Sequence, residues 1–170
     1  MKNVRRIWMT VRFLVMNAGI AALYAVLTLA FAPLSYGPVQ VRFSEAMTLL
    51  AFVNRKWIPG LVLGCFAANL GSPLGPVDVI FGTVATFFAL WPMKYARTMW
   101  QASLMPVVAN GLIIAGELVY ISDIPAGAFP VTALYIGAGE FLSVTIMGQI
   151  VMRLLLSRKP VAAFLRERRL

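Results

Sequence analysis

The sequence predicts an all-α integral membrane protein, a single bundle of six transmembrane helices with both termini cytoplasmic. Of its 170 residues, 61% are apolar and 12% are charged, whereas soluble domains are about 45–50% apolar and about 25% charged. A soluble core cannot take up so much apolar surface, because a domain of about 150 residues buries only about 70% of its surface. At about 20 residues per spanning helix, the chain allows six spans with short loops and no separate soluble domain.

Turns rich in proline, glycine or basic residues separate the expected helices. The first helix follows a basic N-terminal segment and ends at Pro33, and the segment 34–43 after it is predicted to be a loop of extended character. The second helix is short for a bilayer, which leaves its boundaries the least defined. The expected spans are residues 13–33, 44–53, 57–71, 77–92, 102–121 and 131–153, and residues 154–170 form a basic cytoplasmic tail.

The positions of the basic residues predict the orientation of the bundle. With the N-terminus inside, 14 of the 15 Lys and Arg residues lie in segments expected to be cytoplasmic, and Arg42 alone lies outside. Such an excess is usual for cytoplasmic loops, and it supports an even number of spans. Because the basic residues are spread between apolar runs, the net charge of +9 indicates topology rather than nucleic-acid binding.

Several residue types that most enzymes need are missing from this chain. It contains no histidine and a single cysteine, Cys65, so an internal disulfide is excluded and the commonest general base and metal ligand is absent. It also lacks the GxxxxGK[ST] phosphate-binding loop, so the chain cannot hydrolyse ATP itself. We therefore predict a protein that is not an enzyme and holds no cofactor or metal. A transport role would need an ion gradient or a partner that supplies energy.

Four of the six acidic residues lie in or at the ends of the expected spans, in the outer half of the membrane or near its midplane. These four are Glu45, Asp78, Glu117 and Glu140. A charge at the bilayer centre costs at least ~2.5–3.5 kcal/mol, so such residues usually face the protein interior and mark function. Asn69 ends the third span on the same side, and Asn110 lies seven residues before Glu117, on the same helical face.

These residues predict a polar pocket that opens outward. Because acids outnumber bases there, the ligand should be rich in hydrogen-bond donors, cationic, or both. A purely structural role is the alternative for each acid. Asp78 and Glu45 can stabilise helix N-termini, with Ser44 as an N-cap before Glu45, and Arg42 can pair with Glu45 at the i,i+3 spacing.

The first span contains small residues at four-residue spacing. Ala18 and Ala22 form one such pair, and Ala21 and Ala25 form another. In lipid this spacing lets a partner helix approach closely, because packing replaces the hydrophobic driving force. Packing within the bundle is the alternative explanation.

Three segments resemble the QueT family of queuosine-precursor transporters, which are substrate-binding (S) components of energy-coupling-factor (ECF) transporters. The segments are YGPVQVRFSEAMTLL at 36–50, GCFAANLGSPLGPVDVIFGTVATFFA at 64–89 and ALYIGAGEFLSVTIMG at 133–148. The stretches RFSEA and SPLGPVD carry most of the specificity, and the similarity in hydropathy covers nearly the whole chain.

The resemblance implies a six-helix S component of the cell membrane that binds its substrate from outside. The loop after the first span would act as a lid that includes Arg42. The first span, with Ala18, Ala21, Ala22 and Ala25, would dock on a transmembrane coupling subunit. Two cytoplasmic ATPase subunits would then drive toppling of the S component and release of the substrate inward.

The implied substrate is a 7-deazaguanine base, such as queuine or a prequeuosine base. Its exocyclic amine and ring N–H form a paired donor edge that one carboxylate can accept, and an aminomethyl group suits a second. The expected site consists of Glu45, Asn69, Asp78, Asn110, Glu117 and Glu140, with Arg42 in the lid. The alternatives are an S component for another vitamin, an ion-coupled transporter of small cations, and a structural or assembly subunit without a ligand.

Overall fold

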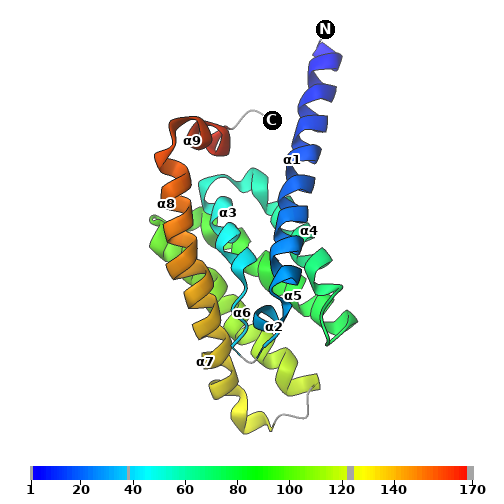
Figure 1. The fold of residues 1–170 in the computed structure, drawn as a ribbon, viewed down its shortest axis with the longest axis vertical. Coiled ribbons are helices and arrows are strands. Elements are labelled where there is room, and N and C mark those ends of the chain that lie inside the picture. The colour runs from blue at the N-terminus through cyan, green and yellow to red at the C-terminus, as the bar shows by residue number, and fades with distance from the viewer. Residues whose placement is uncertain (1, 38, 122–124, 168–170) are drawn as a thin grey trace.

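The computed structural model describes residues 2–37, 39–121 and 125–167, with side chains described from Thr10 onward. All regular elements in these ranges are helical, which confirms the predicted all-α class. The molecule is an elongated bundle (Figure 1). The start of α1 (Lys2–Ala30) and the short α9 (Lys159–Arg166) lie at one end, and the end of α6 (Met99–Ile121) and the start of α7 (Phe129–Glu140) lie at the other.

The main helices form a closed ring in which successive elements pack side by side. α1 packs on α4 (Ile58–Asn69), α4 on α5 (Pro76–Leu90), α5 on α6, and α6 on α7. The ring is closed by η1 (Phe43–Leu49), a 3-10 helix that packs on α1 and on the π-helical segment η5 (Phe141–Gly148). Side chains that point into this ring are shielded from lipid.

Within the described residues, four helical segments are long and apolar enough to cross a membrane, namely Thr10–Ala30, Pro76–Tyr95, Met99–Ile121 and Ala126–Ser157. The elements at the expected second and third spans are shorter. The second is the apolar stretch Phe43–Val53, and the third is α4 with 12 residues. A helix of that length rises about 18 Å at about 1.5 Å per residue, less than the about 30 Å of a hydrocarbon core.

Two helix boundaries in the structure differ from the limits of the expected spans. Pro33 does not end the first helix: α1 stops at Ala30, and Pro33 lies in the first turn of α2 (Ala32–Ser35), where a missing N–H is tolerated. The last helical stretch begins before residue 131 and passes through α7, η5 and α8 (Gln149–Ser157) as one long rod. This rod follows the side of the bundle opposite α1 (Figure 1).

The C-terminal segment folds back onto the basic turn at 54–57, as the position of α9 beside the upper bundle in Figure 1 shows. The indole Nε1 of Trp57 donates to the carbonyl of Leu165 at 3.2 Å, and Lys56 Nζ donates to the carbonyl of Glu167 at 2.8 Å. Arg12 Nη2 lies 3.0 Å from Glu167 Oε2. The described part of the expected tail therefore consists of the end of α8 and the docked helix α9.

The contact between α1 and α4 depends on a glycine. A Cβ atom added at Gly64 would lie 2.7 Å from Tyr24 Cβ and 3.0 Å from Ala21 Cα. We expect Gly64→Leu to destabilise the bundle by about 1–3 kcal/mol, because overpacking forces helices apart. The measurement is the thermal unfolding midpoint of the purified protein in detergent. Gly19→Leu is the matched control, since a Cβ atom added at Gly19 would lie more than 4 Å from the packing atoms of the described residues outside its own helical turn. Equal midpoints for the two variants would contradict this tight packing.

Candidate functional site

All the residues expected to form the polar pocket are buried inside the ring of helices. Their exposed fractions are 4% for Arg42, 1% for Glu45, 0% for Asn69, 1% for Asp78, 5% for Asn110, 0% for Glu117 and 3% for Glu140. They come from five parts of the fold. Arg42 and Glu45 lie at the start of η1, Asn69 ends α4 and Asp78 lies in the first turn of α5. Asn110 and Glu117 lie on α6, and Glu140 ends α7.

Arg42 ties the loop before η1 to three other elements. Its Nε donates to the carbonyl of Ser35 at 3.1 Å, and its Nη1 donates to Asn69 Oδ1 at 3.3 Å. Its Nη2 lies 3.9 Å from Asp78 Oδ2, a charge pair too long for a hydrogen bond. The alternative Arg42–Glu45 ion pair does not form among the described residues, because the guanidinium turns toward α4 and α5.

Glu45 is held by α1. The hydroxyl of Tyr24 donates to Glu45 Oε1 in a short hydrogen bond. The neighbouring Ser44 does not cap η1, as its hydroxyl lies 2.6 Å from that of Thr28. Glu45 and Asp78 do lie in the first turns of η1 and α5, so the stabilising role expected at helix N-termini is compatible with their positions.

Glu140 and Asn110 form a pair between α7 and α6. Asn110 Nδ2 donates to Glu140 Oε1 at 2.8 Å. The seven-residue spacing places Asn110 and Glu117 on one face of α6. The side-chain amide of Asn110 points from this face toward α7. Glu117 is fully buried, and neither of its carboxylate oxygens has a hydrogen-bond partner among the described residues.

The four carboxylates and Arg42 form one electrostatic cluster. Glu117 interacts with Asp78 and Arg42, and Glu140 interacts with Glu45 and Arg42. Arg42 is therefore the neighbour that the acids share. A single guanidinium among four carboxylic groups leaves this interior rich in acceptors and short of donors.

Many polar atoms in this interior have no hydrogen-bond partner among the described residues. Each of the four acids has at least one such oxygen, namely Glu45 Oε2, Asp78 Oδ1, Glu117 Oε1 and Oε2, and Glu140 Oε2. The other atoms without a partner are Arg42 Nη2, Thr83 Oγ1 and Ser143 Oγ. A buried polar group without a partner costs about 1–3 kcal/mol, and a charged one costs more. Such a concentration of acceptors fits a binding site whose ligand supplies the donors.

The described residues of the loop before η1, 36–37 and 39–42, close this interior on one side. The hydroxyl of Tyr36 donates to the carbonyl of Ala68 at 2.6 Å, which anchors the start of the loop on α4. At Gln40 the backbone turns with φ of 48°. The carbonyl of Val39 rests so closely on Gly139 that a Cβ atom there would overlap it. The loop therefore seals against α7 next to Glu140.

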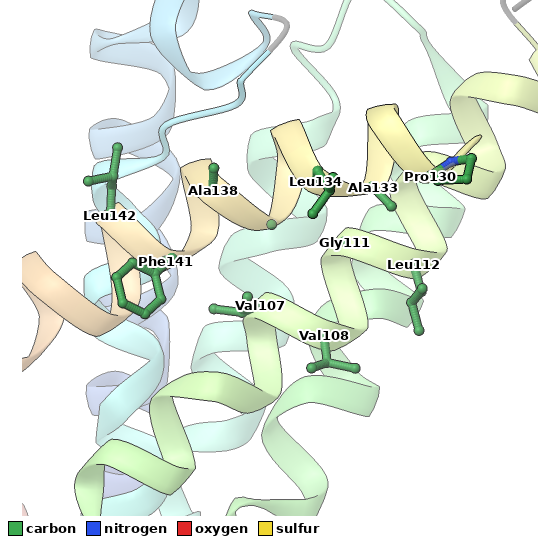
Figure 2. Close-up of a pocket in the computed structure, with 11 residues that line it drawn as sticks. Val107, Val108, Gly111, Leu112, Pro130, Ala133, Leu134, Ala138, Phe141 and Leu142 are labelled. Atoms are coloured by element: carbon green, nitrogen blue, oxygen red, sulfur yellow. The ribbon is translucent and has the colours of Figure 1, made fainter. Parts of the chain in front are cut away.

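The groove between α6 and α7 has a different character (Figure 2). It has a volume of about 890 Å³, and its lining residues, among them Val108, Leu112, Leu134 and Phe141, are all apolar. None of the described residues that line it offers a polar side chain to a donor-rich ligand. The buried carboxylate cluster, and not this outer groove, is the candidate site.

Comparison with known proteins places the chain in a family. Residues 14–157 match the family model described as QueT transporter. The chain belongs to the QueT transporter family. A curated relative, the queuosine precursor transporter QueT of Lactococcus lactis subsp. cremoris (strain MG1363), is 32% identical over 143 residues, which cover 75% of this chain and 82% of the relative. No solved structure matches the chain.

Membership of the QueT family confirms the resemblance seen in the three segments at 36–50, 64–89 and 133–148. The family consists of transporters, so the chain is a transport protein and not an enzyme. The apolar helices agree with a protein embedded in a membrane. The matched region contains the whole buried cluster.

Sequence reasoning missed the polar face of the first helix of this QueT family member. Asn17, Tyr24 and Thr28 are all buried on the side of α1 that faces the bundle. Asn17 Oδ1 accepts from the backbone N–H of Gly60 at 2.7 Å, and Tyr24 and Thr28 contact η1 as described. Their spacing of seven and four residues puts them on one helical face, a pattern that could have identified them.

The alanines of α1 are divided between two faces. Ala21 and Ala25 face inward, because Ala21 packs on Gly64 and Ala25 on the apolar core. Ala18 and Ala22 are exposed, next to Gly19. Only the second pair lies on a surface that a partner helix can reach.

Proposed function

We propose that the chain is the substrate-binding membrane subunit for uptake of a queuosine precursor, a 7-deazaguanine base such as queuine or a prequeuosine base. The observation that carries this proposal is the buried cluster of four acids with free acceptor oxygens. A base of this class offers several N–H donors and fits an interior that lacks them. The printed name of the Lactococcus lactis relative supports the same substrate class.

The pair of Glu140 and Asn110 suits the donor–donor–acceptor edge of such a base. Glu140 Oε2 is free to accept from the ring N–H or the exocyclic amine. The amide of Asn110 donates one hydrogen to Glu140, and its second N–H is available for the ring carbonyl. Glu45, Asp78 or Glu117 would accept from a cationic aminomethyl group, where one is present. Asn69 and Arg42 would hold the lid over the bound base.

We infer a topology of six spans with both termini cytoplasmic in the cell membrane. The stretch Phe43–Val53 and α4 would be the short second and third spans, surrounded by longer helices. Nearly all basic residues then lie inside. The carboxylate cluster and the loop at 36–42 would lie toward the outer side, so the substrate enters from outside.

We further propose that a separate ECF module supplies the energy, through a transmembrane coupling subunit and two cytoplasmic ATPase subunits. The chain contains no phosphate-binding loop of its own. The exposed strip of Ala18, Gly19 and Ala22 on α1 allows a partner helix to approach closely. Ala21 and Ala25 face the interior of the bundle and would not contact the partner helix. They would support this docking only by packing α1 against the rest of the chain.

Reconstitution in lipid vesicles tests this function. We expect vesicles that contain the chain alone to bind radiolabelled queuine or prequeuosine base without accumulating it, with or without ATP. Addition of the coupling module and ATP should produce uptake. Accumulation by the chain alone under a proton gradient would contradict the proposal and favour an ion-coupled transporter of small cations. Selective binding of riboflavin or thiamine would instead favour an S component for another vitamin.

A further inference from the structure

A second cavity lies at the end of the bundle that carries the termini. It has a volume of about 440 Å³ and is formed where the turn after α3 (Leu50–Val53) meets the segment after α5. Its lining residues are Ala51, Phe52, Val53, Asn54, Arg55, Met93, Lys94 and Ala96. Two cations from separate elements, Arg55 and Lys94, thus share one cavity.

Neither cation has an acidic partner among the described residues. The ion pairs between described residues join Arg12 to Glu167 and Arg42 to Asp78. Lys94 Nζ lies 4.5 Å from the ring centroid of Trp91 and 4.5 Å from that of Tyr95, which holds the ammonium group over two aromatic rings. The described lining of the cavity contains no acidic side chain, so it is complementary to an anion.

An apolar groove of about 530 Å³ adjoins this cavity on the outer side of α4 and α5. It is lined by Arg55, Ile58, Pro59, Val62, Leu63, Phe87 and Trp91. Leu63, Phe87 and Trp91 are 57%, 40% and 51% exposed, which places the groove on the surface that faces hydrocarbon in a membrane. Arg55 lines both the cationic cavity and the apolar groove, so the two spaces lie on either side of one guanidinium group or next to it.

We propose that the cavity and the groove together bind one anionic glycerophospholipid. The phosphate group lies between Arg55 and Lys94, and an acyl chain follows the groove past Val62 and Leu63. Basic pockets at the ends of transmembrane helices are suited to anionic head groups, and aromatic rings such as Trp91 are enriched at the membrane–water interface. A free phosphate would use only the cavity, and a neutral lipid only the groove.

The test is native mass spectrometry of the full chain, delipidated in detergent and then supplied with lipid. The probes are phosphatidylglycerol, phosphatidylcholine with the same acyl chains, and inorganic phosphate. We expect one phosphatidylglycerol to be retained in preference to phosphatidylcholine. The double variant Arg55→Gln, Lys94→Gln should lower this retention about tenfold or more, since each basic residue contributes about 1 kcal/mol to the attraction of an anionic lipid. Arg97→Gln, at an exposed position that lines neither space, should not change it.

A second variant tests the groove separately. Val62→Trp fills the apolar space and leaves both cations in place, so it should also reduce retention of phosphatidylglycerol. Equal retention of the two lipids would overturn the proposal, as would complete competition by inorganic phosphate, which would indicate a free-anion site. The double variant could also keep phosphatidylglycerol but lose assembly with a coupling subunit. That result would overturn the proposal in favour of a protein-docking surface.

Discussion

The Arg42→Met variant is expected to melt well below the wild-type protein and to lose substrate binding. Methionine keeps much of the side-chain volume but removes the donors to Ser35 and Asn69 and the charge beside Asp78. Breaking a buried charge pair by removing one partner costs about 3–5 kcal/mol, because the other charge is left uncompensated. The measurements are the unfolding midpoint in detergent and the affinity for a 7-deazaguanine.

Two further variants give this prediction its controls. Arg97→Met makes the same chemical change at an exposed position and should leave both quantities unchanged. Asp78→Asn combined with Arg42→Met should restore part of the lost stability, since no uncompensated charge is left at that pair. If Arg42→Met and Arg97→Met melt at the same temperature, Arg42 does not anchor the loop.

The Gly139→Leu variant is expected to weaken substrate binding about tenfold or more and to speed release. Any side chain at Gly139 overlaps the carbonyl of Val39, so the loop at 36–42 must move off α7 or α7 must shift. Overpacking of this kind costs about 1–3 kcal/mol, so the closed conformation of the loop is destabilised by that amount relative to an open one. A destabilisation of about 1.4 kcal/mol lowers the affinity about tenfold. Faster hydrogen exchange at the amide of Gln40, which donates to the carbonyl of Gly37 at 3.0 Å, would report the opening directly.

Gly127→Leu is the matched control for this loop prediction. Gly127 lies in η4 (Ala126–Ala128), and a Cβ atom added there would meet none of the described residues within 4 Å, so the same substitution should leave affinity and exchange unchanged. Slow exchange and full affinity in Gly139→Leu would show that the loop does not act as a lid.

The composition and the position of the acids were sufficient to predict much of this protein. A chain that is 61% apolar is compatible with few folds other than a helical membrane bundle. The cost of charge in a membrane identified Glu45, Asp78, Glu117 and Glu140 as interior residues, and all four are buried. These inferences succeeded because they depend on energies that act on each residue separately, whatever its neighbours.

The partners within the site could not be predicted in the same way. Arg42 lies beside Asp78, and Asn110 donates to Glu140, and neither of these pairs was predicted. Such pairs depend on how helices are rotated and how closely they approach, which hydropathy along one chain does not contain. The hydrogen bond from the Tyr24 hydroxyl to Glu45 was missed for the same reason.

The helix lengths illustrate a further limit. Hydropathy reports apolar segments but not whether each one crosses the membrane alone or is covered by protein. The stretch Phe43–Val53 and α4 are short, and their place in the bundle comes from packing against α1, η5 and α5. The extent of α9 likewise depends on contacts with the turn at 54–57, far away in the sequence.

The central claim is that the buried carboxylates recognise the donor edge of a 7-deazaguanine. Calorimetric titration of the purified chain with queuine and a prequeuosine base, beside riboflavin and thiamine, tests it most directly. We predict selective binding of a 7-deazaguanine. In Glu140→Gln it should weaken about tenfold to a hundredfold, as a hydrogen bond to a charged group contributes about 1.5–3 kcal/mol. The half-buried ion-pair residue Glu167, which lies outside the buried cluster, provides the control, and Glu167→Gln should bind like the wild type. Absence of 7-deazaguanine binding, or equal affinity in Glu140→Gln and the wild type, would contradict the account.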